Sequence, residues 1–146
     1  MPTRTARTAW NGSLEEGAGQ VELTSSKIAT YDVSFPKRSA EEADGFTSPE
    51  ELIAAAHSSC FAMQLSALLT GAGGTVEALD VSDEVSLGPD PDGGFKLTGI
   101  TVKVTGEVSG IDEDTFLQSA DEAKRTCPVS KALTGVEISV EATLQN

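Results

Sequence analysis

The order of the predicted elements places this chain of 146 residues in the α+β class, with antiparallel sheets around a central buried helix. Short alternating segments come first, a long uncharged segment over 52–69 follows, and two long alternating segments then flank a turn. The order is therefore three strands, a helix, two strands, a helix and a strand. Because helices and strands do not alternate one by one, a doubly wound nucleotide-binding fold is not expected. We predict a single domain over residues 1–146.

Three short strands are expected at the N-terminal end. Residues 3–11 are rich in threonine and lead into the turn signal Asn11-Gly12, and alternation of side chains marks Gly19–Thr24 and Ile28–Phe35 as the next two strands. They predict an antiparallel meander. The polar connection that follows, Pro36–Thr47, is long for a compact domain and is expected to be either a functional or a solvated loop.

The central helix has a clear start signal. Ser48 can cap it, Pro49 fits the first helical position, and Glu50 and Glu51 suit the first turn. Residues 52–69 then carry no formal charge, which predicts a helix that is apolar nearly all round and lies in the middle of the protein. Eighteen residues reach the lower limit for crossing a membrane, but the polar side chains within the segment and its acidic flank favour a soluble core helix.

The remaining elements follow from alternation and from turn signals. Two long strands are expected to form a hairpin around the turn at 90–94, and a helix that Asp112 caps is expected to end near Cys127-Pro128. A short helix before the last strand completes the chain. The expected segments are Thr75–Leu87, Phe95–Val108, Pro128–Leu133 and Val136–Leu144.

Composition excludes several function classes. The formal charge of -13 would repel a phosphate backbone, so nucleic acid is not an expected partner, and neither is a membrane. The first residues contain no apolar stretch typical of a signal peptide, so we expect a cytoplasmic location. In that compartment two cysteines indicate a pair that cycles between reduced and oxidised forms better than they indicate a structural disulfide.

The two cysteines, Cys60 and Cys127, occupy different local settings. If Pro128 starts a short helix, Cys127 is its N-cap, where backbone N–H groups favour a thiolate. Three cations, Lys124, Arg125 and Lys131, are also close in sequence. Cys60 lies near the middle of the central helix and has no such support, so it would need a cation from elsewhere in the fold.

Helix geometry selects the side chains that can join Cys60. His57 and Gln64 share its side of the helix, and Glu50 lies about 80° away, whereas Glu51 is on the opposite face. Ten residues of straight helix nevertheless separate Glu50 from Cys60 by roughly 15 Å. Glu50 would reach a site around Cys60 through a bend, through an intermediary or on another chain.

His57 has two interpretations. The spacing His57-x-x-Cys60 is compatible with a metal bound on one helical face, but too few further ligands exist for a zinc site without Glu50 or water. A single histidine on an apolar helix face is more often a core residue that one hydrogen bond satisfies. We expect no bound metal.

The segment Ser48–Met63, together with Cys127-Pro128-Val129-Ser130, closely resembles the OsmC/Ohr family of thiol peroxidases. His57 and Val129 favour the OsmC branch. The resemblance implies the OsmC-like fold, an intertwined homodimer, and a peroxidase that reduces organic hydroperoxides and, less well, hydrogen peroxide. It assigns Cys60 as the peroxidatic cysteine and Cys127 as the resolving one.

The same resemblance implies the rest of the site. Arg38, with Lys37 as its rival, would activate Cys60, and Glu50 would orient the arginine. Cys60 would become a sulfenic acid and then form a disulfide with Cys127. The resemblance implies no bound cofactor but an external dithiol reductant, a lipoyl group on a partner protein. An apolar pocket for the hydroperoxide tail is expected from three side chains, Phe46, Phe61 and Met63.

Two other functions remain open from the sequence. The chain would act as a redox-sensing dimer if its reversible disulfide altered a surface without turnover. It would be a structural domain if both cysteines were inert.

Overall fold

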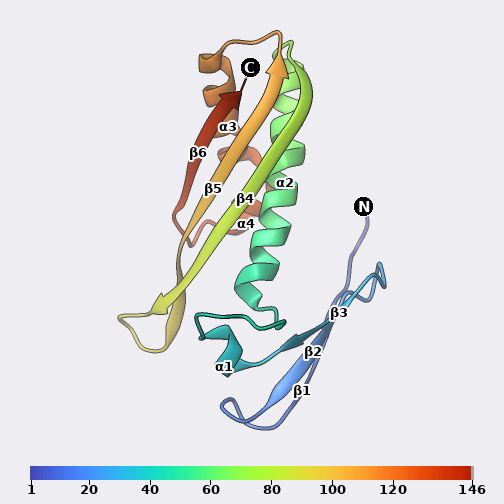
Figure 1. The fold of residues 1–146 in the computed structure, drawn as a ribbon, viewed down its shortest axis with the longest axis vertical. Helices are drawn as coiled ribbons and strands as arrows, with labels where there is room; N and C mark the ends of the chain where they lie inside the picture. Colours follow the sequence, from blue (N-terminus) through green and yellow to red (C-terminus); the bar gives the residue numbers. More distant parts are fainter. Residues whose placement is uncertain (146) are drawn as a thin grey trace. The chain divides into compact units, whose positions relative to one another are not determined.

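The computed structural model describes residues 1–145, and these form an α+β protein, as predicted (Figure 1). The chain divides into two compact units, Met1–Leu52 and the residues from Ile53 onward. The prediction of one domain over 1–146 stays a prediction.

The first unit contains the predicted antiparallel meander. Strands β1 (Arg7–Asn11), β2 (Ala18–Glu22) and β3 (Thr30–Val33) form a three-stranded sheet in the order β1-β2-β3. Gly19 lies opposite Trp10, and a Cβ added at this glycine would stand 2.9 Å from the indole ring. The glycine therefore lets the Trp10 side chain lie across its neighbouring strand.

A short helix, α1 (Phe35–Arg38), follows β3. The third strand was expected to extend to Phe35 and a loop to begin at Pro36. The Ser34 hydroxyl accepts a hydrogen bond from the N–H of Lys37, and a proline occupies the first turn, so the local sequence supports a helix start. The expectation of a strand to Phe35 is therefore wrong at its end. This helix carries both basic candidates, Lys37 and Arg38.

The central helix α2 (Pro49–Gly71) begins as predicted, because the Ser48 hydroxyl accepts a hydrogen bond from the N–H of Glu51 at 3.1 Å. It starts in the first unit and continues in the second. One row at four-residue spacing is fully buried: His57, Phe61, Leu65 and Leu69. The opposite face is exposed in the single chain, so the prediction of a helix buried all round is corrected to a helix buried on one side.

The second unit contains a sheet of three strands, β4 (Thr75–Pro89), β5 (Phe95–Ser109) and β6 (Ile138–Gln145), in the order β4-β5-β6 (Figure 1). The β4–β5 hairpin is antiparallel, as predicted. The last strand is a correction, because β6 pairs with β5 in parallel. Helices α3 (Glu113–Thr126) and α4 (Pro128–Ala132) connect the two strands, and such a helical crossover returns the chain in the same direction.

The core of the second unit lies between this sheet and helices α2 and α3. It includes Phe61, Leu65 and Leu69 of α2, Phe116, Ala120 and Ala123 of α3, and Ile100, Val102, Val104 and Val108 of β5. Among the described residues, α2 is the one helix long and apolar enough to cross a membrane. Because its buried row packs in this core, we interpret α2 as the core helix of a soluble protein.

Candidate active site

The cysteines that the sequence singles out meet in the second unit. The sulfur of Cys60, from the middle of α2, lies 2.8 Å from the sulfur of Cys127, which is 67 residues further along the chain. Both cysteines are free thiols in this structure, and Cys127 is fully buried. Two sulfurs this close need only a small movement to form a disulfide.

Local backbone geometry places Cys127 at this point. Its N–H bonds the carbonyl of Ala123 as the end of α3, and its extended backbone (φ -58°, ψ 125°) turns the chain into Pro128 at the start of α4. Cys127 is therefore the N-cap residue of α4, as the sequence predicts. Its side chain makes no regular capping hydrogen bond, but it lies beside the N–H groups of the first turn.

The two thiols differ in acidity. Burial raises the pKa of Cys127, but hydrogen bonds from Cys60, from the backbone and hydroxyl of Ser130 and from the backbone of Val129 outweigh burial, so this pKa lies below its ordinary value. Burial and the hydrogen bond with Cys127 raise the pKa of Cys60. These directions agree with the expectation that Cys127, and not Cys60, has a local reason for thiolate character. Within the second unit, the backbone N–H of Val129 lowers the pKa of Cys60, but burial and Cys127 outweigh it.

The activating pair expected from the resemblance is formed in the first unit. The Arg38 guanidinium donates from Nη2 to Oε1 of Glu50 at 2.7 Å and from Nε to both carboxylate oxygens at 3.1 and 3.2 Å. Lys37 instead forms an ion pair with Asp44. Within residues 1–145, Nη1 of Arg38 has no hydrogen-bond acceptor, so part of the guanidinium fork is left for another group.

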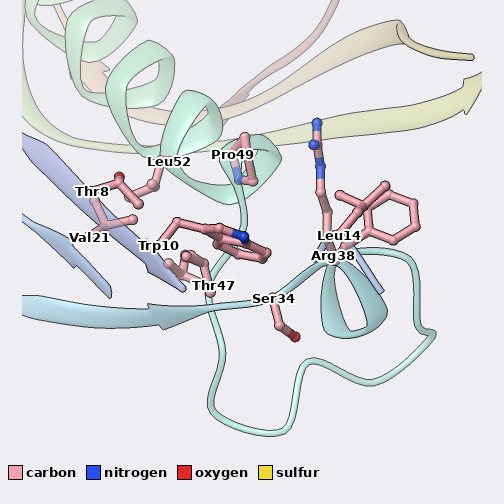
Figure 2. Close-up of a pocket in the computed structure, with 11 residues that line it drawn as sticks. Thr8, Trp10, Leu14, Val21, Ser34, Arg38, Thr47, Pro49 and Leu52 are labelled. Carbon is pink, nitrogen blue, oxygen red and sulfur yellow. The ribbon is translucent and has the colours of Figure 1, made fainter. Parts of the chain in front are cut away.

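The Arg38 side chain also borders a cavity of about 300 Å³ in the first unit (Figure 2). Figure 2 shows Trp10 in the middle of this pocket and Arg38 at one side of it. Most of the remaining lining is apolar: Leu14, Val21, Val33, Phe35, Pro49 and Leu52. The cavity therefore combines an apolar wall with one cationic group, a combination suited to a ligand that has a hydrocarbon part and a polar end.

The three side chains expected to bind a hydrocarbon tail do not line this cavity. Phe61 is buried in the core of the second unit, Met63 is 73% exposed on the free face of α2, and Phe46 is partly buried in the loop before α2. Their assignment to the substrate stays a prediction. Trp10, Leu14 and Phe35 were not predicted for a pocket, because only the folded meander brings these distant positions together.

The structure adds Asp83 and Ser130 to the residues around the cysteines, and both contact His57. His57 is fully buried and has two partners, Asp83 of β4 at Nδ1 and Ser130 of α4 at Nε2, the latter at 2.6 Å. His57 is thus a core histidine with two hydrogen bonds where one was expected. A signal for Asp83 existed: it occupies the apolar face of its strand, between Val81 and Val85.

Metal binding finds no support in the geometry of the described residues. Among residues 1–145, no group of three or more histidine, cysteine, aspartate or glutamate side chains is arranged to hold a metal ion. The spacing His57-x-x-Cys60 instead directs these two side chains to different partners, Ser130 and Cys127.

Comparisons with known proteins agree on one family. A family model described as "OsmC-like protein" matches residues 42–141. The chain is 39% identical to Peroxiredoxin OsmC of Escherichia coli (strain K12) over 137 residues, covering 94% of this chain and 93% of that protein. It is 35% identical to Organic hydroperoxide resistance protein-like 2 of Staphylococcus epidermidis (strain RP62A), over 77% of this chain and 79% of that one.

A solved structure gives the same result. The crystal structure of the organic hydroperoxide resistance protein OhrB of Bacillus subtilis superimposes with a TM-score of 0.72 at 27% identity, covering 97% of this chain and 98% of that chain.

Proposed function

Because this chain belongs to the OsmC/Ohr family, we propose that it is a thiol-dependent peroxidase that reduces organic hydroperoxides to alcohols and, less well, hydrogen peroxide to water. The observation that carries the proposal is the contact of the Cys60 and Cys127 sulfurs at 2.8 Å. The names of the relatives, a peroxiredoxin and an organic hydroperoxide resistance protein, are consistent with this activity.

The first chemical step belongs to Cys60. Its thiolate attacks the terminal oxygen of the hydroperoxide, the O–O bond breaks, and the alkoxide leaves and takes up a proton to become the alcohol. Cys60 is thereby oxidised to a sulfenic acid. Cys127 then attacks the sulfenic sulfur, the S–O bond breaks, and a Cys60–Cys127 disulfide and one water form.

Arg38 and Glu50 supply the activation that the second unit lacks. A guanidinium beside the Cys60 sulfur would lower the pKa of that thiol and would hold the peroxide oxygen, while Glu50 fixes the plane of the guanidinium. Ten helical residues place Glu50 roughly 15 Å along α2 from Cys60 of the same chain. We therefore assign the Arg38–Glu50 pair to the Cys60 of a second copy in an intertwined homodimer.

The apolar face of α2 supports a homodimer. In the single chain Ala56, Ser59, Met63 and Ala67 are exposed, although the helix carries no charge over 52–69. Small side chains at this spacing let a second helix approach closely, and burial of Met63 alone would contribute about 1.5–3 kcal/mol.

The proposed substrate is supported by the site, and the proposed reductant is supported by the family resemblance. The cavity beside Arg38 is apolar, so we propose hydroperoxides with a hydrocarbon part as the preferred substrates. The disulfide must then be reduced by an external dithiol, for which we propose a lipoyl group on a partner protein, in the cytoplasm. The catalytic chemistry proposed here uses no bound cofactor.

Steady-state turnover tests this function. Purified protein with dihydrolipoamide should consume cumene hydroperoxide continuously, Cys60→Ser should abolish consumption, and Cys127→Ser should slow it and lead to inactivation by overoxidation. Unchanged consumption by Cys60→Ser would refute the proposal. A single stoichiometric burst without turnover would favour a redox sensor instead.

A further inference from the structure

A buried row of hydrogen-bonded polar side chains, called the polar chain below, lies next to the cysteine pair. Asp83 bonds Nδ1 of His57, and Nε2 of His57 lies 2.6 Å from the hydroxyl of Ser130. The side chains of Asp83 and His57 have no exposed surface, and Ser130 is only 4% exposed. The chain brings together three elements, β4, α2 and α4.

The chain and the cysteine pair connect the same two segments. His57 and Cys60 are three residues apart on α2 and therefore lie on one face of that helix. Cys127 and Ser130 are three residues apart at the start of α4. His57 contacts Ser130 and Cys60 contacts Cys127, so two adjacent contacts, at 2.6 and 2.8 Å, run between α2 and α4.

Stability alone does not account for this arrangement. Burying a carboxylate and an imidazole costs several kcal/mol for each group that becomes charged, and apolar side chains of similar size often stabilise a core better. One oxygen of Asp83, Oδ1, is buried without any hydrogen-bond partner among the described residues. A polar chain at this depth that adjoins two free thiols points to a functional role.

We propose that Asp83, His57 and Ser130 form a proton relay that takes the proton of Cys127 when its sulfur attacks the oxidised Cys60. The inference rests on the proposed function and assigns residues to its resolving step. Ser130 adjoins the reacting cysteine, whereas His57 and Asp83 act through Ser130 as positioning residues.

The proton and electron balance of the step is complete. With an ionised Asp83 accepting from Nδ1–H, Nε2 of His57 accepts from the Ser130 hydroxyl. As Cys127 loses its proton to the Ser130 oxygen, the Ser130 proton passes to His57, and Asp83 stabilises the imidazolium. The Cys127 thiolate then forms the S–S bond. Hydroxide leaves Cys60 and takes the proton that the His57 imidazolium returns through Ser130, so it departs as water and His57 becomes neutral again.

The electrostatic surroundings of Cys127 fit this direction of transfer. After the transfer the Ser130 hydroxyl donates to the thiolate, and that interaction lowers the pKa of Cys127. The ionisable groups that face the relay are Cys60 from α2, Cys127 before α4 and Asp83 from β4. Within residues 1–145 no other charged side chain bonds a member of the chain, and Lys131 is exposed.

Single-turnover kinetics test the relay. Reduced protein is mixed with one equivalent of cumene hydroperoxide, and the loss of the Cys60 thiol and the appearance of the disulfide are followed separately, with dimedone trapping the sulfenic acid. Ser130→Ala and Asp83→Asn should slow disulfide formation roughly 10–100-fold at neutral pH and should slow Cys60 oxidation much less. The rate difference between these variants and wild type should become smaller as the pH is raised toward the pKa of an ordinary thiol, about 8.5, because hydroxide then removes the Cys127 proton.

The matched variants separate a relay from packing. Ser130→Thr keeps the hydroxyl and should restore most of the rate. Thr126→Val removes a neighbouring hydroxyl that accepts from Gln64 of α2 but is outside the chain, and it should leave disulfide formation within about twofold of wild type. The relay would be overturned if Ser130→Ala slowed disulfide formation equally at all pH values, or if Thr126→Val slowed it as much.

A second readout does not depend on peroxide chemistry. In the Cys60→Ser background, the ultraviolet absorbance of the thiolate reports the titration of Cys127 without peroxide. Adding Ser130→Ala should raise the pKa of Cys127, and adding Thr126→Val should not. An unchanged titration in Ser130→Ala would overturn the relay even if the protein proves to be a peroxidase. A raised pKa in a protein without turnover would refute the proposed function and would support only the interaction between Ser130 and Cys127.

Discussion

At the scale of single residues, the two thiols of the pair are unequal, and the inequality has a structural origin. Cys127 lies at the start of α4, where the hydrogen bond with Cys60, the N–H groups of the first turn and the Ser130 hydroxyl together outweigh the effect of burial on its pKa. Cys60 lies in the middle of α2, where burial and Cys127 raise its pKa. The proposal assigns Arg38 the task of counteracting these effects on Cys60.

Arg38 and Lys37 make a matched pair of neighbouring cations. Arg38→Lys keeps the charge but loses the planar fork that bonds both oxygens of Glu50, so kcat/KM for cumene hydroperoxide should fall by about tenfold or more. Lys37→Gln removes only an ion pair with Asp44 and should change kcat/KM by less than about twofold. The reverse ranking of the two variants would transfer the activating role to Lys37.

At the scale of elements, the sequence predicts the type of most segments well. Ser48 and Asp112 cap their helices through the predicted hydrogen bonds, and the turn at 90–94 joins the predicted hairpin. The parallel pairing of β6 was missed because strand direction depends on where the crossover through α3 and α4 returns the chain. Local alternation of side chains carries no information about that direction.

The cap of α3 predicts a pH dependence of stability. The hydrogen bond from Thr115 lowers the pKa of Asp112 from 3.8, so the charged cap stabilises the fold above this value and its contribution is lost as pH falls through the lower, folded-state pKa. Asp112→Ala should lower the melting temperature by roughly 2–5 °C at pH 7, and the difference from wild type should diminish as pH falls below the ordinary value of 3.8.

An isosteric control separates the charge of this cap from its hydrogen bond. Asp112→Asn keeps an acceptor at the N-cap and should melt close to wild type at pH 7 without the acid-dependent loss. A wild-type advantage over Asp112→Ala that is constant from pH 7 to pH 2, measured by circular dichroism, would contradict this assignment.

The candidate site shows where prediction from the sequence ends. Sequence motifs indicate four site residues, and the structure places them in two pairs, each within one unit: Cys60 with Cys127, and Arg38 with Glu50. Asp83 was visible as an acidic residue on an apolar strand face, but its partner depends on how β4 packs against α2. The cavity lining depends on the folded meander, so no local pattern indicates Trp10 or Leu14.

At the scale of the whole molecule, the proposal pairs Arg38 of one chain with Cys60 of a second copy. Mixed dimers test this directly. If Arg38 serves Cys60 of its partner, a dimer of one Arg38→Ala chain and one Cys60→Ser chain contains one intact site, although each variant alone is inactive. Co-expressed, differently tagged chains should therefore recover about half of the wild-type activity per dimer. No recovery in a purified mixed dimer would place Arg38 and Cys60 of one chain in the same site.

The central claim is that hydroperoxide reduction passes through a disulfide between Cys60 and Cys127. Mass spectrometry of peptides after one equivalent of cumene hydroperoxide, without reductant, tests it most directly. We predict one disulfide-linked peptide pair that joins Cys60 to Cys127 within a single chain, with one molecule of alcohol released for each chain. A stable sulfenic acid on Cys60, a disulfide between chains, or unmodified cysteines with intact hydroperoxide would contradict the account.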